Sequence, residues 1–214
     1  MRFDRPRLTP RRATGTPAAV QDSPRLVLAS ASPRRRELLA AAGVRFEIEP
    51  ADVPEEIRPA EAPEAFAERL ACEKALAVAA RGHASRFVLG ADTVVVLDGE
   101  PLGKPVDPRD AEAMLARLQG RSHRVVTGVA LVRGDRVRSL RVESRVHMRP
   151  ADSEEIRRYV ASGEPLDKAG SYAAQGEGRR LIVRIEGSET NVIGLPMDET
   201  LRLLAEAGLE WRAP

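Results

Sequence analysis

The sequence predicts an α/β fold with a mixed β-sheet and flanking helices. Apolar runs of strand length alternate with helical stretches, and most of these stretches end at a glycine. Alternation of this kind is typical of crossover connections between parallel strands. The dipeptides Asp98-Gly99 and Gly134-Asp135 instead predict hairpins, which join antiparallel strands. Both kinds of connection in a chain of 214 residues predict one sheet with parallel and antiparallel strands.

The expected elements follow from local signals along the chain. Ser32 and Pro33 provide an N-cap and a first-turn proline for the first helix, and Asp152 with Glu155 forms a capping box for the fourth. The apolar run FVLGA is expected to end as a strand at about Asp92, before the hairpin. The predicted strands are 25–30, 44–49, 86–92, 123–133, 136–148 and 181–186, and the predicted helices are 33–42, 61–81, 108–119, 153–162 and a proline-started helix within 194–209.

Composition limits the classes of function. Apolar residues make up 43% of the chain and charged residues 31%, which is typical of a globular protein, and the formal net charge is +2. Aromatic residues are only 3%, which argues against nucleic-acid binding through stacked bases. The one cysteine, Cys72, excludes an internal disulfide and a cysteine-based zinc site. No apolar run reaches the ~18 residues of a membrane span, so we expect a cytoplasmic protein without a membrane or nucleic-acid partner.

Residues 1–24 differ in composition from the rest of the chain. They are rich in Arg, Pro and Thr and lack the apolar core of a secretory signal. An Arg-rich segment with few acidic residues is also compatible with a transit peptide. We expect a disordered tail here, followed by a single domain over 25–214.

The first predicted helix begins with three arginines, Arg34, Arg35 and Arg36. The N-terminus of a helix is its positive end and disfavours cations. The same place is a common anion site because free backbone N–H groups converge there, and arginine can bind phosphate oxygens through two N–H groups at once. The three arginines therefore favour an anion with several charges at this helix end. The alternative is a basic turn that faces water.

Lys74 and Asp92 stand out from their apolar surroundings. Lys74 falls in the middle of the apolar stripe of the second helix, so its ammonium group must either reach water or meet a negative partner. Asp92 follows the apolar run FVLGA, and ligands usually bind at the carboxyl ends of strands in α/β sheets. A carboxylate there can hold a divalent metal or orient a water molecule. It can also simply cap the turn.

Further candidates lie in the first hairpin and in the glycine-rich loop 163–178. Lys104, in the sequence LGKP, is expected to fold back near Asp92. The loop carries Asp167, Lys168 and Gln175 among glycines that allow close approach of a ligand, and a glutamine can read the edge of a nucleobase. The three histidines lack metal-ligand spacing, and the sequence has no Walker motif and no nucleophile elbow. Bound phosphate would therefore rely on arginines, lysines and a helix end.

Six segments resemble, in the same order, the motifs of the Maf family of nucleoside triphosphate pyrophosphatases. They are LASASPRRRELL, CEKA, GADTVVVLDGEPLGKP, SHRVVTGVAL, YVASGEPLDKAGSYAAQG and NVIGLP, and the resemblance extends over 25–207. It implies hydrolysis between the α- and β-phosphates of a nucleoside triphosphate, giving the monophosphate and pyrophosphate, with Mg²⁺ or Mn²⁺. It also implies a fold like that of the inosine triphosphate pyrophosphatases, with two lobes around a central cleft, and a homodimer.

The resemblance also assigns roles to individual residues. Asp92 corresponds to the proton acceptor, and Glu55 and Asp92 correspond to metal ligands. The cations that neutralise the triphosphate are Arg35, Lys74 and Lys104. The positions that bind substrate or set specificity are Ser30, Arg34, Thr93, Lys168 and Gln175.

Within the family, the chain is similar to the branch that prefers dTTP and UTP. Arg34, Thr93, Lys168 and Gln175 match that branch, whereas the branch that prefers 7-methyl-GTP differs at these positions. Glu189 departs from the pattern, because a commonly aromatic position here carries a carboxylate that can alter packing or dimer contacts. The alternatives are the same chemistry on 7-methyl-GTP or inosine triphosphate, and a non-catalytic nucleotide-binding regulator of cell division.

Overall fold

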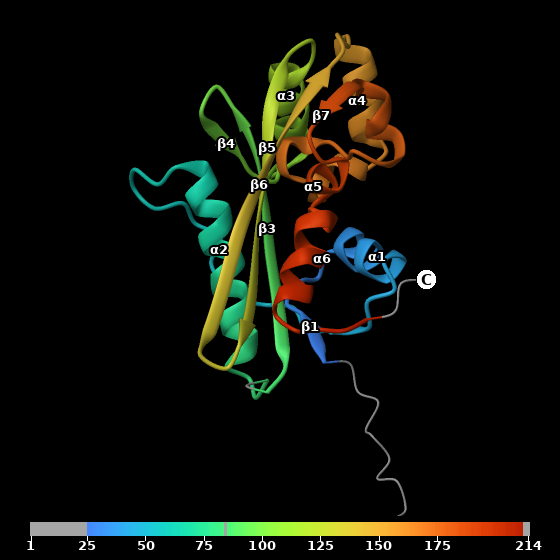
Figure 1. Cartoon of the computed structure of the whole chain (residues 1–214). Coiled ribbons are helices and arrows are strands. Elements are labelled where there is room, and N and C mark those ends of the chain that lie inside the picture. Colours follow the sequence, from blue (N-terminus) through green and yellow to red (C-terminus); the bar gives the residue numbers. More distant parts are fainter. Residues whose placement is uncertain (1–24, 84, 212–214) are drawn as a thin grey trace, which may run out of the picture.

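A computed structural model describes residues 25–83 and 85–211 of the chain (Figure 1). The tail predicted for residues 1–24 lies outside these residues. Within them the centre is a seven-stranded sheet in the order β2-β1-β3-β5-β6-β7, with β4 paired to the far end of β3. The strands are β1 Leu26–Leu28, β2 Phe46–Ile48, β3 Phe87–Leu97, β4 Glu100–Leu102, β5 Ser122–Arg133, β6 Arg136–Met148 and β7 Ile182–Glu186.

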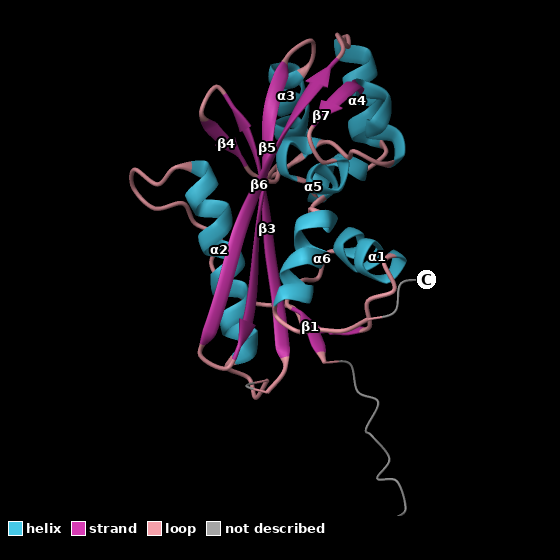
Figure 2. Cartoon of the chain, viewed as in Figure 1, coloured by secondary structure: helices cyan, strands magenta, loops and turns pink. Residues whose placement is uncertain are grey.

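The sheet is mixed, as predicted. β1 runs parallel to β2 and β3, whereas β3, β5, β6 and β7 form antiparallel pairs in turn. The connections follow the same division, because one helix joins β1 to β2 and another joins β2 to β3, whereas a tight turn joins β5 to β6. The prediction of an α/β fold with a mixed sheet and flanking helices is confirmed (Figure 2).

All the predicted helices form, and several short ones were not predicted. Ser32 and Asp107 cap their helices through side-chain oxygens, and Asp152 accepts from the amide of Glu155. The reciprocal half of the predicted capping box is wrong, because the Glu155 carboxylate pairs with Arg149 instead. The helices are α1 Pro33–Ala41, α2 Pro63–Ala79, α3 Pro108–Leu118, α4 Ser153–Ala161, α5 Glu189–Ile193, α6 Met197–Glu206 and the 3₁₀ turns η1 Glu164–Asp167, η2 Ala169–Ser171 and η3 Gly176–Leu181.

The long strands β3, β5 and β6 pass through two lobes (Figure 1). In the lobe that contains β1, α2 covers one face of the sheet and α1 and α6 cover the other. Alternate residues serve the two faces: Val27 and Val88 pack toward α2, whereas Leu28 and Leu89 pack toward α1 and α6. The second lobe has a separate core in which α3, α4 and α5 pack around the other ends of the same strands. Among the described helices, none is both long and apolar enough to cross a membrane.

Strand β3 does not end at Asp92, so that prediction is wrong. The β-branched residues after Asp92 continue the ladder with β5 as far as Val96, opposite Arg124. On the other side, the parallel neighbour β1 pairs only as far as Leu28, opposite Leu89. Asp92 therefore lies inside a long strand, three residues past the place where its neighbour stops. The end of β1 opens the space next to the Asp92 side chain.

Helix α2 lies unusually close to the sheet because two glycines face it. A Cβ atom on Gly90 would lie 2.2 Å from the carbonyl oxygen of Ala71, and one on Gly128 would lie 2.3 Å from that of Ala67. Side chains of α2 can therefore contact groups on β3 directly. Gly128 is also the cross-strand partner of Asp92. Its close contact with Ala67 therefore sets how near α2 lies to the strand position of Asp92.

We expect Gly128→Ala to lower the free energy of unfolding by about 3 kcal/mol, because helix and sheet must separate to admit the methyl group. Denaturant unfolding of the variant measures this loss. Gly103→Ala is the control, since a Cβ at Gly103 meets no atom within 4 Å. Equal stability of the two variants would contradict the close packing of α2.

Candidate active site

A cavity of about 490 Å³ lies between the two lobes, and most of the candidate residues line it. Its lining comes from the end of β1, the start of α1, the middle of β3 and the loops that follow β4 and α4. Gln175 is exposed and is not among the lining residues, so its base-reading role stays a prediction. The predicted residues that line the cavity are Ser30, Arg34, Arg35, Glu55, Lys74, Asp92, Thr93, Lys104, Asp167 and Lys168.

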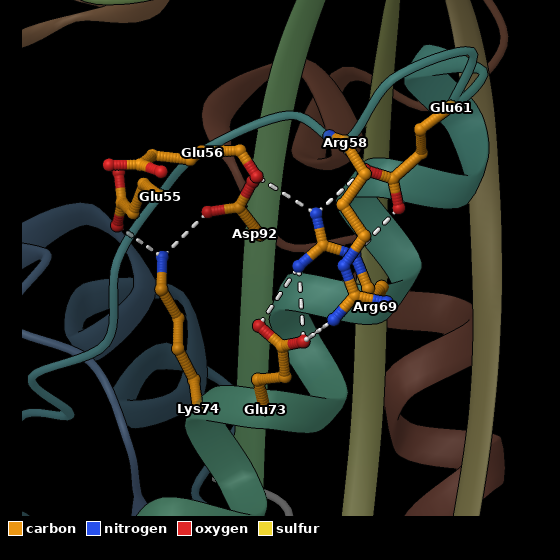
Figure 3. A network of polar contacts seen from close by, with 8 residues as sticks. All are labelled: Glu55, Glu56, Arg58, Glu61, Arg69, Glu73, Lys74 and Asp92. Atoms are coloured by element: carbon orange, nitrogen blue, oxygen red, sulfur yellow. Dashed lines mark hydrogen bonds and ion pairs between the residues drawn. The ribbon is translucent and has the colours of Figure 1, made fainter.

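The Lys74 ammonium group lies between two carboxylates (Figure 3). Its Nζ is 2.5 Å from Oε1 of Glu55 and 2.6 Å from Oδ1 of Asp92. Lys74 and Asp92 are each only 8% exposed. The lysine in the apolar stripe of α2 thus meets negative partners, and the alternative that its ammonium group reaches water is wrong. A buried lysine between two carboxylates marks a place built for charge.

The two carboxylates differ in their protonation behaviour. Burial raises the pKa of the Asp92 carboxyl, and the positive charges of Lys74 and Arg35 oppose this only in part. Partial burial also acts to raise the pKa of Glu55, but there the hydrogen bond and charge of Lys74, together with Lys104, lower it. Glu55 is therefore the more firmly ionised of the pair, and Asp92 is the better proton acceptor.

Arg35 turns into the protein and is held on three sides. Its Nε donates to the carbonyl oxygen of Gly194 at 2.8 Å, Nη1 donates to Oγ of Ser30 at 3.1 Å, and Nη2 donates to Oγ1 of Thr93 at 3.1 Å. Burial lowers the pKa of this guanidinium below its ordinary value, and the charge of Asp92 opposes the effect. The three arginines of α1 therefore differ: Arg35 is buried, Arg34 lines the cavity and Arg36 is exposed.

A second layer behind Arg35 was not foreseen from the sequence. Thr93 Oγ1 lies 2.9 Å from Thr127 Oγ1, which donates to the carbonyl oxygen of Asn191 at 3.0 Å. The fully buried Asn191 amide donates in turn to Val125 and Ser144. These bonds tie α5 to the sheet and place the Gly194 carbonyl against Arg35. The NVIGLP motif was a signal for this layer, but α5 itself is too short to be predicted. Glu189 is exposed in the first turn of α5, where a carboxylate is favoured.

The glycine-rich loop is more ordered than its composition predicts. The Glu164 carboxylate accepts from the Tyr159 hydroxyl at 2.7 Å and from the amides of Glu177 and Gly178 at 3.0 and 2.8 Å. Lys168 Nζ donates to the carbonyl oxygen of Glu164 and to the Asp167 carboxylate, both at 2.5 Å. The sequence analysis missed Tyr159 and Glu164, although they fix the loop that brings Lys168 to the cavity.

His123 lies behind the residues that line the cavity and contacts one of them, Tyr172. Its Nε2 lies 2.6 Å from the hydroxyl of Tyr172, a buried residue that lines the cavity. Nδ1 of His123 is buried and has no hydrogen-bond partner among the residues that the structure describes. Burial lowers the pKa of His123 from 6.5 to about 4. The imidazole is therefore neutral at pH 7 in the folded protein.

We expect this histidine to make folding sensitive to acid. Between pH 6.5 and about 4 the unfolded chain binds a proton at His123 that the folded chain does not, so the free energy of unfolding falls as the pH falls. The loss amounts to about 3 kcal/mol at 1.36 kcal/mol per pKa unit. Unfolding of His123→Gln at pH 7 and pH 4 should show a correspondingly smaller loss than the wild type. Identical losses would mean that His123 does not titrate between these values.

The carboxylates fit a divalent metal that shares its coordination with a ligand. In residues 25–83 and 85–211, no group of three His, Cys, Asp or Glu side chains is placed to hold a metal alone. Mg²⁺ commonly takes one or two carboxylates, with the rest of its shell from phosphate oxygens and water. Glu55 and Asp92 are such a pair, and they already face one cation, the ammonium group of Lys74.

Comparisons with known proteins show which proteins this chain is similar to. A family model described as Maf-like protein matches residues 25–207. The dTTP/UTP pyrophosphatase of Myxococcus xanthus is 54% identical over 194 residues, which covers 90% of this chain and 98% of that protein. The dTTP/UTP pyrophosphatase of Symbiobacterium thermophilum is 50% identical over 183 residues, with 86% and 94% covered. The solved structure of the Staphylococcus aureus Ham1 protein is 14% identical, with a TM-score of 0.47, and covers 85% of this chain and 98% of that chain.

The family match extends over nearly all of the described residues and includes each of the six motifs identified in the sequence. Identity near one half holds over almost the full length of the relatives. The prediction made from the motifs is confirmed. The chain belongs to the Maf family.

Proposed function

We propose that the protein hydrolyses dTTP and UTP between the α- and β-phosphates, releasing the nucleoside monophosphate and pyrophosphate. The observation that carries the proposal is the Glu55–Lys74–Asp92 cluster, in which Lys74 and Asp92 are buried and which lines a cavity together with Arg34, Arg35, Lys104 and Lys168. The relatives named dTTP/UTP pyrophosphatase support the substrate choice. Such a cavity can hold a triphosphate chain against one carboxylate that accepts a proton.

Glu55 and Asp92 would hold the divalent metal, Mg²⁺ or Mn²⁺. Such an ion polarises phosphate oxygens and neutralises their charge. Asp92 orients the attacking water and accepts its proton, a role that suits a carboxyl whose pKa burial raises. Lys74 fixes the Asp92 side chain through the 2.6 Å contact and adds positive charge next to it.

The remaining cations stabilise the negative charge that grows as pyrophosphate leaves. Arg35 is preorganised by three hydrogen bonds, so it needs no rearrangement when the charge develops. Lys104 lies on the loop after β4 and lines the same cavity. Arg34 and Lys168, which also line the cavity, contribute to substrate selection together with Ser30 and Thr93.

A panel of nucleoside triphosphates tests the proposal. We expect Mg²⁺- or Mn²⁺-dependent release of pyrophosphate from dTTP and UTP, with much less from inosine triphosphate, 7-methyl-GTP or dCTP. Release of orthophosphate instead would contradict cleavage between the α- and β-phosphates. A preference for 7-methyl-GTP or inosine triphosphate would assign the same chemistry to another base. Binding without hydrolysis would favour a nucleotide sensor.

Gln175→Glu, measured on the same panel, tests the role of Gln175 in base selection. Gln175 stands at the start of η3, next to the residues Ala173 and Ala174 of the cavity wall. We expect the variant to lose its preference for dTTP and UTP, because a carboxylate accepts hydrogen bonds but cannot donate them. An unchanged preference would remove Gln175 from the specificity residues.

We also propose that the enzyme acts on cytoplasmic nucleotide pools and forms a homodimer. Light scattering after size-exclusion chromatography measures the molar mass against the 23.3 kDa of one chain. A mass near that of one chain would contradict the dimer.

A further inference from the structure

We infer that Arg69 is a positioning residue, which holds the acidic loop (residues 50–62) on helix α2 so that Glu55 meets Lys74 and Asp92. The inference rests on the proposed function, because it concerns the residue that would help to hold the metal. Arg69 does not line the cavity. It acts through the loop that carries Glu55.

The Arg69 guanidinium binds both the loop and its own helix (Figure 3). Its Nε and Nη2 each lie 2.6 Å from an oxygen of the Glu61 carboxylate, and Nη2 also donates to the Glu56 carbonyl oxygen at 3.0 Å. Nη1 donates to both oxygens of Glu73, one turn along α2, at 3.0 Å. The Arg69 and Glu61 side chains are only 16% and 11% exposed. Glu73 thus fixes the guanidinium, and the guanidinium fixes the loop next to Glu55.

The backbone of the loop adopts an unfavourable conformation where it makes this contact. Between Arg58 and Glu61 it makes a turn, with the Glu61 amide donating to the Arg58 carbonyl oxygen at 3.0 Å. Ala60, in the third position of the turn, has a φ of 59°, a left-handed conformation that is unfavourable for a residue with a Cβ atom. Such a backbone persists only where surrounding contacts enforce it. The paired Glu61 carboxylate is that contact.

The other end of the loop is also fastened to the region of α2. Arg81, two residues past the helix end, donates from Nη1 to the Pro50 carbonyl oxygen at 3.0 Å. The Glu49 carboxylate pairs with Arg81 and with Nε2 of His83. The loop is therefore held by Arg69, within α2, and by Arg81, just past the end of α2, and Glu55 lies between the loop residues that these arginines bind.

Glu55 itself has little else to hold it. Its side chain is 46% exposed, its segment is neither helix nor strand, and within the described residues its side chain bonds to Lys74. One hydrogen bond to one carboxylate oxygen leaves the carboxylate free to turn, so Lys74 alone does not fix the segment that carries Glu55. The geometry of Glu55 depends on the anchors at each side of it. Arginine suits this task because its planar fork donates two parallel bonds to the two oxygens of Glu61, a bidentate geometry that the ammonium group of lysine does not reproduce.

Arg69→Gln and Glu61→Gln test the inference from both sides of the contact. Glu61→Gln leaves the stacking of Arg69 over Phe66, 5.4 Å from the ring centroid, untouched. Arg124→Gln is the matched control: Arg124 also binds two carboxylates, Glu64 of α2 and Glu143 of β6, but no residue of the loop. All variants are first compared with the wild type in thermal unfolding, so that loss of the fold is recognised.

Two measurements then distinguish an effect of Arg69 on the acidic loop from an effect on the stability of the whole protein. The first is the rate at which the glutamate-specific protease Glu-C cleaves after Glu55 and Glu56. The second is the Mn²⁺ concentration that gives half-maximal pyrophosphate release from dTTP. We expect both to rise about tenfold in Arg69→Gln, a typical effect for partners that orient metal ligands, and to rise less in Glu61→Gln. Arg124→Gln should match the wild type in both.

Three results would overturn the inference. The first is an unchanged cleavage rate and an unchanged half-maximal Mn²⁺ concentration in both Arg69→Gln and Glu61→Gln. The second is faster cleavage without a higher half-maximal Mn²⁺ concentration, and the third is changes of equal size in Arg124→Gln. Failure of the proposed function would look different, because the wild type itself would then release no pyrophosphate. The protease rates would still show whether Arg69 holds the loop.

Discussion

Asp92→Asn should lower the rate of pyrophosphate release from dTTP by about 10²–10³-fold without unfolding the protein. An amide cannot accept the proton of the attacking water and is a poor metal ligand, so the variant loses two functions of one side chain. The shape of the residue is preserved, and the amide oxygen still accepts from Lys74, which lies 2.6 Å from the carboxylate in the wild type. The β3 ladder on either side of the residue does not involve its side chain.

The measurement is single-turnover and steady-state pyrophosphate release, with circular dichroism to confirm the fold. Asp98→Asn is the control, because Asp98 lies on the same hairpin, is exposed, and binds Arg121, outside the cavity lining, through its carboxylate. Its φ of 54° is one that asparagine tolerates. Full activity of Asp92→Asn would remove Asp92 from its assigned role, and equal losses in both variants would point to a change in the fold.

Lys74→Met should impair both stability and activity. Methionine fills the space of the lysine stem, but it leaves the Asp92 carboxylate without its nearest cation in a site that is 8% exposed. Loss of one partner from a buried ion pair typically costs about 3 kcal/mol or more, because the remaining charge is uncompensated. The rate of hydrolysis should fall by about 10²-fold or more, since a preorganised positive charge next to the phosphates is lost.

Chemical denaturation and pyrophosphate release measure the two effects separately. Lys74→Arg retains the charge, so we expect it to recover most of the stability. Its larger, planar head cannot keep the 2.5 and 2.6 Å contacts of Nζ, so activity should stay below that of the wild type. A Met variant as stable as the wild type would show that Asp92 does not depend on Lys74 for its charge balance.

Much of the local structure was predictable because its causes are local. Ser32 and Asp152 accept from amides within three residues, and Pro33 has a φ already suited to the first turn, so the starts of α1 and α4 follow from the sequence. The error at Asp92 has a different origin. A single carboxylate after an apolar run suggests a strand end, but the ladder with β5 carries the strand on to Leu97. Pairing with a distant strand overrides that local signal.

The site was predictable only in part. Periodicity showed that Lys74 is out of place in α2, and helix polarity showed that the arginines of α1 need an anion. Neither argument identifies partners. Lys74 meets Glu55 and Asp92 from positions 19 and 18 residues away, and Arg35 binds the carbonyl of Gly194 from 159 residues away. Arg69 gave no signal at all, since an arginine on the polar side of an amphipathic helix is ordinary.

The sequence by itself determined the α/β class, the main helices and strands, and, through its ordered motifs, the Maf family. Only the tertiary structure decided which charged groups share a cavity, which arginine turns inward and how the acidic loop is fastened. The physical reason is one of range. Caps, turns and hydrophobic periods act within about four residues, whereas a site forms where the sheet order brings distant segments together. Here the early end of β1 beside the long β3 makes that place.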